Sequence, residues 1–320
     1  MNNLWRRPSA LSLANYATIS VDSLFRHYMH DNEQAANVKD PPAKPSRAFR
    51  VCQWNVHYFC STDSSGGYIR TFNQVFTELM RHGPDVIVLN EFAAEDPNEN
   101  LSFLRRLENE GYKHLRAADI HFPTVVLVRY EGEVDHIEDF ALDLDRRAVM
   151  IGLKLPEKNE SQQDSIETTK PRHLWIYGTH LHHVEDFPGR RLSEMKNLMN
   201  HVQNRPQTDA FLIVGDFNQQ REQDYTPTEW RRIVANKAHR TESFTSDGVA
   251  ELLQRTHGFT CVWDNALNRN WPATDPPPAT HWSGTVIDYT YSRNLQNVGA
   301  YVSSMGSSDH RLVISDWTVS

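Results

Sequence analysis

Short apolar runs of strand length recur along this sequence, and segments with helical periodicity lie between them. Residues 86–89 and 210–214 are apolar throughout, and runs of this length are typical of buried strands. Apolar residues recur at helical spacing in residues 69–80 and 192–202, and Gly83-Pro84 marks the end of the first of these helices. This alternation predicts a domain built from layers of both strands and helices.

The other expected elements continue the alternation. Further strands are expected at residues 49–56, 125–128, 149–155, 173–178, 286–291 and 312–314, and a further helix at 101–107. Residues 157–170 are polar and are interpreted as a surface insertion. Residues 271–280 contain four prolines and are interpreted as a loop.

The N-terminal region has a different composition from the rest. Clustered proline in residues 40–46 predicts a linker, so we expect an extension over residues 1–48 and a catalytic domain over residues 49–320. The first 21 residues contain no acid and include Arg6 and Arg7. Both a transit peptide and a disordered or loosely docked tail are compatible with that composition.

Bulk composition limits the classes of function. The formal net charge of −8 argues against a broad nucleic-acid coat, which needs a basic balance, but it leaves a locally basic rim open. The three scattered cysteines show neither a disulfide framework nor zinc spacing, which favours a reducing compartment. No apolar run approaches the roughly 18 residues that span a bilayer. We therefore expect an intracellular protein of the cytoplasm or nucleus, with mitochondrial import as the alternative.

Polar residues stand at the ends of the expected strands. The runs concerned are Gln53-Trp54-Asn55, Asn90-Glu91-Phe92, Thr179-His180, Gly215-Asp216-Phe217-Asn218, Ile287-Asp288-Tyr289 and Ser308-Asp309-His310. A sheet whose strand ends converge on one edge would gather these side chains in one cleft.

The residue types in this set suit phosphoryl chemistry. A carboxylate such as Glu91 can hold Mg²⁺, which keeps much of its hydration. Asp216 can deprotonate or orient an attacking water, and Asn218 can donate a hydrogen bond without adding charge. His310 can contact a phosphate, and Asp288 is the expected carboxylate partner that fixes its tautomer and favours its protonated form.

Taken in order, these six runs resemble the endonuclease/exonuclease/phosphatase superfamily, which has the DNase-I-like fold. The resemblance covers Arg50 to Trp317. It implies an α/β (α+β) fold arranged as a four-layer α/β/β/α sandwich, with two packed mixed sheets flanked by helices. It also implies a divalent-metal-dependent phosphoesterase that uses Mg²⁺ or Mn²⁺.

The resemblance further implies a role for each residue of the set. Asn55, Glu91 and Asp309 form the metal side, and His180 contacts the scissile phosphate. Asp216 and Asn218 handle the nucleophile, and Asp288 pairs with His310. Arg147 is expected to bind phosphate because many family members have an arginine where a strand begins there, although Arg146 competes for that role.

Some positions depart from individual branches of the family. His57 stands where abasic-site endonucleases of the family have an aspartate. Gln219-Gln220 after Asn218 does not match the inositol-polyphosphate phosphatases. The stretch from Thr179 to His183 looks like poorly characterised metal-dependent hydrolases and, in part, like the 5′-tyrosyl-DNA phosphodiesterases. A zinc site at its three histidines lacks a suitably spaced fourth ligand, so one catalytic histidine with two structural or rim histidines is favoured.

Three functions stay open at this stage. The first expectation is a nuclease or other phosphodiesterase that uses in-line attack by water on a phosphoester substrate, with nucleic acid as a candidate partner. The second is a sphingomyelinase-like lipid-headgroup phosphodiesterase, for which the loop from Trp271 to Trp282 is the candidate membrane-facing segment. The third is a non-catalytic binding protein that retains the scaffold. The sequence does not indicate which protein partners the chain has.

Overall fold

The computed structural model describes residues 43–62, 68–93, 96–116, 122–156, 172–183, 189–239, 248–265, 279–303 and 307–319. Most of the expected N-terminal extension, the expected insertion at residues 157–170 and most of the loop expected at 271–280 lie outside them. The first strand begins at Phe49. The division of the chain into an extension and one catalytic domain stays a prediction.

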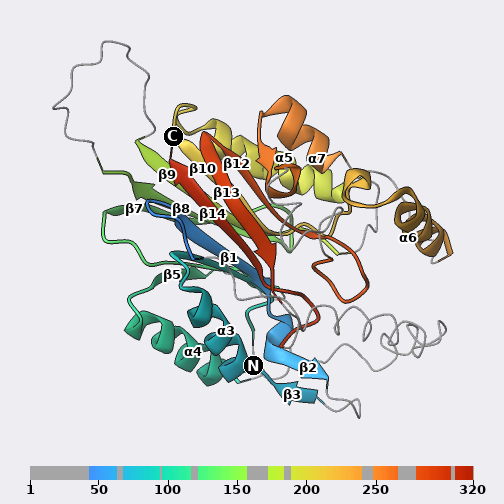
Figure 1. The fold of residues 1–320 in the computed structure, drawn as a ribbon. Coiled ribbons are helices and arrows are strands. Elements are labelled where there is room, and N and C mark those ends of the chain that lie inside the picture. The colour runs from blue at the N-terminus through green and yellow to red at the C-terminus, as the bar shows by residue number, and fades with distance from the viewer. Residues whose placement is uncertain are drawn as a thin grey trace.

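Two six-stranded sheets form the centre of the molecule (Figure 1). The first has the strand order β13-β14-β1-β4-β6-β5. Its strands are β1 (Phe49–Asn55), β4 (Val86–Asn90), β5 (Lys113–Arg116), β6 (Val125–Val128), β13 (Leu295–Val302) and β14 (Val313–Val319). β1 runs parallel to β4 and antiparallel to β14, so the sheet is mixed.

The second sheet has the order β11-β12-β10-β9-β8-β7. Its strands are β7 (Val134–Ala141), β8 (Arg147–Lys154), β9 (His173–His180), β10 (Ala210–Asp216), β11 (Thr260–Cys261) and β12 (Asp288–Arg293). β9 and β10 are parallel, whereas β12 is antiparallel to β10. A separate antiparallel pair is made by β2 (Cys60–Thr62) and β3 (Tyr68–Arg70).

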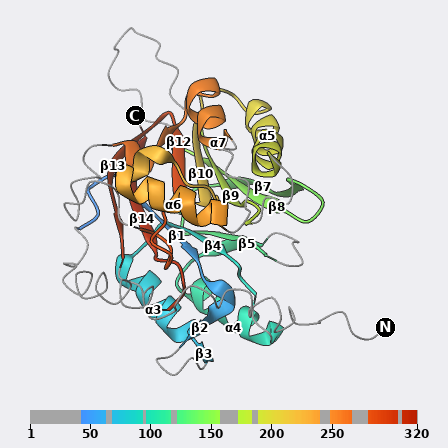
Figure 2. The same cartoon turned by 90° about the vertical axis from the view of Figure 1, so that its right-hand side faces the viewer.

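Helices cover the outer faces of both sheets. Those described are α3 (Phe72–His82), α4 (Pro97–Asn109), α5 (Arg190–Gln203), α6 (Pro227–His239) and α7 (Val249–Glu251), with short turns η1 (His57–Phe59), η2 (Glu222–Asp224), η3 (Leu252–Thr256) and η4 (Val262–Asp264). α3 and α4 lie on one side of the two sheets, and α5 and α7 lie on the other (Figure 2). α3 ends at Gly83, which adopts the left-handed conformation that favours glycine, as the sequence predicts.

The core explains why the central strands are apolar throughout. Val51 and Val88 pack in the cluster that joins the two sheets. Ile87, their neighbour in the first sheet, packs instead with Leu79 of α3 and Leu104 of α4. A strand buried on both faces has no solvent-facing position, so it reads as a continuous apolar run. The predicted four-layer α/β/β/α sandwich is confirmed.

Several expected strands have different ends in the structure, and two of them differ most clearly. The strand expected at residues 286–291 begins at Asp288, because the hydroxyl of Tyr225, rather than β10, bonds the backbone of Val286. The strand expected at residues 312–314 extends to Val319. Within the described residues, no helix is long and apolar enough to cross a membrane.

Gly178 on β9 lies where the two sheets pack closely against one another. A Cβ atom added there would lie 2.5 Å from Val126 Cγ2 and 3.3 Å from Val88 Cγ1, both in the first sheet. We expect Gly178→Ala to lower the free energy of unfolding by roughly 1–3 kcal/mol, as overpacking of a filled core does. Urea denaturation measures the difference. Gly299→Ala on β13 is the matched control, because a Cβ there meets nothing within 4 Å. Equal midpoints for the two variants would contradict this account.

Candidate active site

Strand pairing brings the predicted site residues to one end of both sheets. Asn55 and Asn90 are the last residues of β1 and β4, and they are register partners. Asp216, the last residue of β10, is the register partner of His180 on β9 and of Asp288 on β12. Parallel strands that end together therefore place these polar side chains side by side.

Asp216 lies at the centre of this group. Its Oδ2 atom accepts a hydrogen bond from Asn55 Nδ2 at 3.1 Å. The same oxygen lies 3.5 Å from His180 Nε2 and 3.7 Å from His310 Nε2. Its Oδ1 atom accepts a hydrogen bond from the backbone N–H of Asn218 at 2.8 Å. One carboxylate thus faces two imidazoles and an amide.

His310 and Asp288 form the predicted pair. Asp288 Oδ2 lies 2.9 Å from His310 Nδ1, and Asp288 Oδ1 accepts a hydrogen bond from Gln53 Nε2 at 2.8 Å. Burial alone would lower the pKa of His310, but the carboxylates of Asp288 and Asp216 outweigh it and raise this pKa well above 6.5. His310 is therefore held as a cation with a fixed ring orientation.

The other two acid–base groups have shifted pKa values as well. Burial is the main reason why the pKa of Asp216 is raised to about 7. The positive charge of His310 lowers this pKa, and the negative charge of Asp288 raises it further. Burial and the positive charge of Arg146 lower the pKa of His180 well below its usual 6.5. The site therefore combines a neutral imidazole, a cationic imidazole and a carboxyl group that titrates near neutral pH.

The expected metal side contains two carboxylates near one another. Asn55 Nδ2 donates to Glu91 Oε1 at 3.1 Å, so this amide bridges Glu91 and Asp216. Burial raises the pKa of Glu91, and the negative charge of Asp309 raises it further. A divalent cation would offset this repulsion, and carboxylate oxygens are the ligands that hard cations prefer. Glu91 and Asp309 fit such an ion and would hold it.

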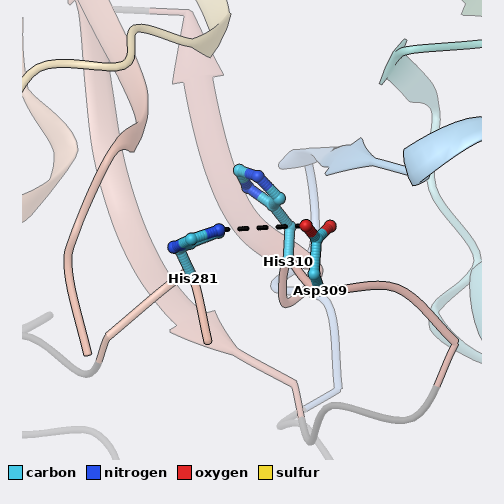
Figure 3. Close-up of side chains that lie close together, drawn as sticks. All are labelled: His281, Asp309 and His310. Carbon is cyan, nitrogen blue, oxygen red and sulfur yellow. Dashed lines mark ion pairs between the residues drawn. The ribbon is translucent and has the colours of Figure 1, made fainter. Parts of the chain in front are cut away.

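Histidines surround Asp309. His57 Nδ1 lies 3.6 Å from Asp309 Oδ1, and His281 Nε2 lies 3.9 Å from Asp309 Oδ2. His281, Asp309 and His310 form a group whose ligand atoms all lie within 4.8 Å of one another (Figure 3). Asp216, Asp288 and His310 form a second such group.

The backbone supports the site in an uncommon conformation. Glu91 and Asn218 have φ angles of 54° and 51°, which non-glycine residues adopt at a cost of about 1–3 kcal/mol. Gly215, just before Asp216, cannot carry a side chain, because a Cβ would lie 1.8 Å from the carbonyl oxygen of Thr179. The glycine of the Gly-Asp-x-Asn run is thus explained by close contact between β9 and β10.

Three residues of the site were absent from the predicted set. Asn90 of the first sheet is hydrogen-bonded to the second sheet. Its Oδ1 accepts a hydrogen bond from the backbone N–H of Asp216 at 3.1 Å, and its Nδ2 donates one to the carbonyl of Thr179 at 3.0 Å. Gln53 orients Asp288. Both belong to strand-end runs of the sequence, which could have identified them. His281 stands in no such run.

The structure does not bring Arg147 to the group. Arg147 Nε pairs with Asp139 Oδ2 at 2.8 Å across the β7–β8 hairpin. Arg146 is the arginine near the site: it is fully buried, and its guanidinium lies 3.9 Å from the centre of the Phe122 ring. That ring contacts His180 edge-on, with 5.7 Å between centroids. Arg146 lies just before β8 and Arg147 is the first residue of this strand, and the two side chains have different surroundings.

The neighbouring histidines belong to the surroundings of Arg146. Arg146 Nε donates to His182 Nδ1 at 3.3 Å, and the rings of His182 and His183 stack with centroids 5.5 Å apart. The backbone N–H of His182 also donates to Glu194 at 2.9 Å. Among described residues, the groups of close metal-ligating atoms include neither histidine. In this geometry His182 is a buried histidine that contacts Arg146, and His183 beside it is exposed.

Comparison with solved structures supports the fold. The structure of an endonuclease/exonuclease/phosphatase from Beutenbergia cavernae DSM 12333 matches with a TM-score of 0.58 and 15% identity, over 85% of this chain and 72% of that one. The human nocturnin catalytic domain with bound sulfate anion matches with a TM-score of 0.58 and 16% identity, over 87% of this chain and 97% of that one. The structure of D. rerio TDP2 complexed with single strand DNA product matches with a TM-score of 0.55 and 13% identity, over 85% of this chain and 99% of that one.

Sequence comparison places the chain in one family. No curated protein matches it. The family model described as Endonuclease/Exonuclease/phosphatase family matches residues 52–310, which span the whole site from Asn55 to His310. The chain therefore belongs to the endonuclease/exonuclease/phosphatase family, whose members hydrolyse phosphoester bonds.

Proposed function

We propose that this protein is a divalent-metal-dependent phosphodiesterase, with a nuclease activity as the first choice, and that water attacks the phosphorus in line with the leaving group. The observation that carries the proposal is the position of Asp216. Its carboxylate lies within 3.7 Å of both His180 Nε2 and His310 Nε2, next to the carboxylates of the metal side. An anionic phosphoester bound there would meet a cationic imidazole, a neutral imidazole and a base.

Each residue then has a chemical task. Asp216 takes a proton from the attacking water as the new P–O bond forms, which a carboxyl group with a pKa of about 7 can do at neutral pH. The opposite P–O bond breaks, and the leaving oxygen departs with the bonding electron pair. Asn218 and Asn55 hold this carboxylate through hydrogen bonds at 2.8 and 3.1 Å. His310 donates to a non-bridging phosphoryl oxygen, and Asp288 keeps it protonated.

The carboxylates of the metal side are proposed to hold the divalent cation. A Mg²⁺ or Mn²⁺ ion held by Glu91 and Asp309, with Asn55 beside them, would offset the charge that builds on the phosphoryl and leaving oxygens. His180 is neutral because its pKa is lowered, so it suits a hydrogen bond to the scissile phosphate. Arg146 supports this side through Phe122, which lies between its guanidinium and His180.

The molecules bound in two similar structures indicate which substrate class to test first. One similar structure is of TDP2 complexed with single strand DNA product, and another is of nocturnin with bound sulfate anion, so related folds bind polynucleotide and tetrahedral anions. A polynucleotide is therefore the first substrate to test.

The lipid-headgroup phosphodiesterase is the second candidate, and an exposed tryptophan beside the site is compatible with it. Trp282 is 39% exposed, and its backbone N–H donates to the carbonyl of Asp309 at 2.9 Å. An exposed indole beside the site suits a nucleobase or a lipid surface equally. Because every position of the set carries a chemically competent side chain, a purely binding role has less support.

We expect hydrolysis of bis-p-nitrophenyl phosphate that requires a divalent cation. EDTA should reduce the rate to background, and added Mg²⁺ or Mn²⁺ should restore it, because the repulsion between Glu91 and Asp309 needs a cation to offset it. A panel of single-stranded DNA, RNA, 5′-tyrosyl DNA, sphingomyelin and inositol phosphates then assigns the substrate. Folded protein that hydrolyses none of these with any divalent metal would favour the binding role instead.

A further inference from the structure

The side chain of His281 faces the metal side from an element that the proposed mechanism does not use. It precedes β12 in a tight turn, and Figure 3 shows its ring directed at Asp309. The distance from His281 Nε2 to Asp309 Oδ2 is 3.9 Å. Two ligands that each lie about 2.1 Å from one ion can be at most about 4.2 Å apart, so these two atoms can share a cation without rearrangement.

The turn holds the imidazole in this orientation. His281 Nδ1 lies 2.7 Å from Ser283 Oγ, which in turn lies 2.9 Å from Thr285 Oγ1. The backbone N–H of Ser283 also donates to His281 Nδ1 at 3.3 Å, so Ser283 holds this nitrogen and Nε2 is the nitrogen that faces Asp309. Histidines that bind metals are usually fixed in this way through the second ring nitrogen.

Backbone hydrogen bonds tie the turn to the segment that carries Asp309. Trp282 N–H donates to the Asp309 carbonyl at 2.9 Å, and Arg311 N–H donates to the Thr280 carbonyl at 2.7 Å. His281 and His310 form an isolated β-bridge. The imidazole and the carboxylate are therefore preorganised on one short two-stranded unit, as a metal site requires.

His310 completes the group of close ligand atoms but has another task. Its Nδ1 lies 2.9 Å from Asp288 Oδ2, and its Nε2 lies 3.7 Å from Asp216 Oδ2. Both ring nitrogens of His310 therefore face carboxylates other than that of Asp309. This leaves Asp309 Oδ2 and His281 Nε2 as the members of the group that are available to an ion.

We propose that His281 is a nitrogen ligand of the divalent cation at Asp309, and that the site therefore prefers a transition metal such as Mn²⁺ over Mg²⁺. This inference rests on the proposed function for the presence of a cation at Asp309. Imidazole suits first-row transition metals, whereas Mg²⁺ takes oxygen ligands almost exclusively. One neutral imidazole in place of a water thus changes which ion binds best.

Pulsed EPR of Mn²⁺ bound to the full chain tests the ligand directly, because a coordinated imidazole produces a ¹⁴N coupling. We expect this coupling in the wild type and its loss in His281→Asn. Mn²⁺ affinity should fall by roughly 10-fold or more, a typical loss for a perturbed metal site. Mg²⁺ affinity, measured by competition against Mn²⁺, should change much less. His281→Gln, together with thermal melting, verifies that the effect does not come from unfolding.

His136→Asn is the matched control, since His136 on β7 also lies near a carboxylate, with Nε2 4.0 Å from Asp135 Oδ2. It should leave the coupling and both affinities unchanged. His57→Asn tests whether His57, whose Nδ1 lies 3.6 Å from Asp309 Oδ1, is the nitrogen ligand instead. Loss of the coupling in His57→Asn but not in His281→Asn would overturn the inference, as would a wild type without any ¹⁴N coupling.

The two proposals fail separately. Metal-dependent hydrolysis without a ¹⁴N coupling contradicts the role of His281 and leaves the proposed function in place. A coupling that His281→Asn removes, in a protein that hydrolyses no phosphoester, supports the ligand and contradicts the proposed function.

Discussion

Asp216→Asn is expected to lower kcat by roughly 10²–10⁴-fold, the range that a lost general base accounts for. The variant keeps the shape of the side chain and the acceptor for the backbone N–H of Asn218, but it cannot take a proton from water. KM should change little, because the imidazoles and the metal side remain. Steady-state hydrolysis of a phosphodiester at saturating metal measures both constants.

Asp209→Asn is the matched control for this variant. Asp209 is also buried and lies at the opposite end of β10, where its Oδ2 accepts a hydrogen bond from Trp175 Nε1 at 2.9 Å. An amide there would leave a buried donor without an acceptor, which lowers stability by about 1–3 kcal/mol. Its kcat at a temperature where it is folded should match the wild type. Wild-type turnover by Asp216→Asn would rule out the proposed base.

Asp288→Asn is expected to have the second largest effect, and the effect should depend on pH. Under the proposed mechanism, the wild-type reaction needs deprotonated Asp216 and protonated His310. The rate should therefore rise as pH passes the pKa of Asp216, about 7, and remain high until His310 loses its proton, well above pH 6.5. Because the groups lie close together, the two limbs of the profile belong to the coupled pair.

Removing the charge of Asp288 should shift both limbs to lower pH. That charge raises the pKa of His310 and also the pKa of Asp216, so both values fall in the variant. The rate at pH 8 should drop by about 100-fold or more, within the range for a lost acid–base group, and the loss at pH 6 should be smaller. A full profile of kcat/KM against pH for both proteins checks this. A profile of unchanged shape and position in Asp288→Asn would show that the pair does not control protonation.

The sequence predicts the centre of each sheet much better than its borders. All eight expected strands are central ones, such as β4 and β10, which are buried on both faces and so are apolar throughout. The four edge strands β5, β7, β11 and β13 were not predicted. β7 shows why: it reads Val134-Asp135-His136-Ile137-Glu138-Asp139, and most of it is exposed. Edge strands carry charged side chains that resist pairing with other chains, and this removes the apolar signal.

The candidate site shows the same dependence on context. The pairing of Asp288 with His310 could be predicted because both residues stand in recognisable strand-end runs. Which of Arg146 and Arg147 lies near the site depends on the direction of each side chain. The sequence does not indicate these directions, because β8 begins at Arg147. His281 reaches Asp309 only through a tight turn and an isolated β-bridge, which no local pattern of residues indicates.

The mixed first sheet has a consequence for the order in which the protein acquires its chemistry during synthesis. β1 pairs with β14 across the full domain, as in the contact between Arg50 and Asp316, which are 266 positions apart. Asp309 and His310 immediately precede β14, so they reach the cleft only when this late strand closes beside an early one. A nascent chain holds Glu91 long before it holds either residue. Such long-range closure is slow, so the proposed catalytic cleft is assembled only after the C-terminal strand has been made and has paired with β1.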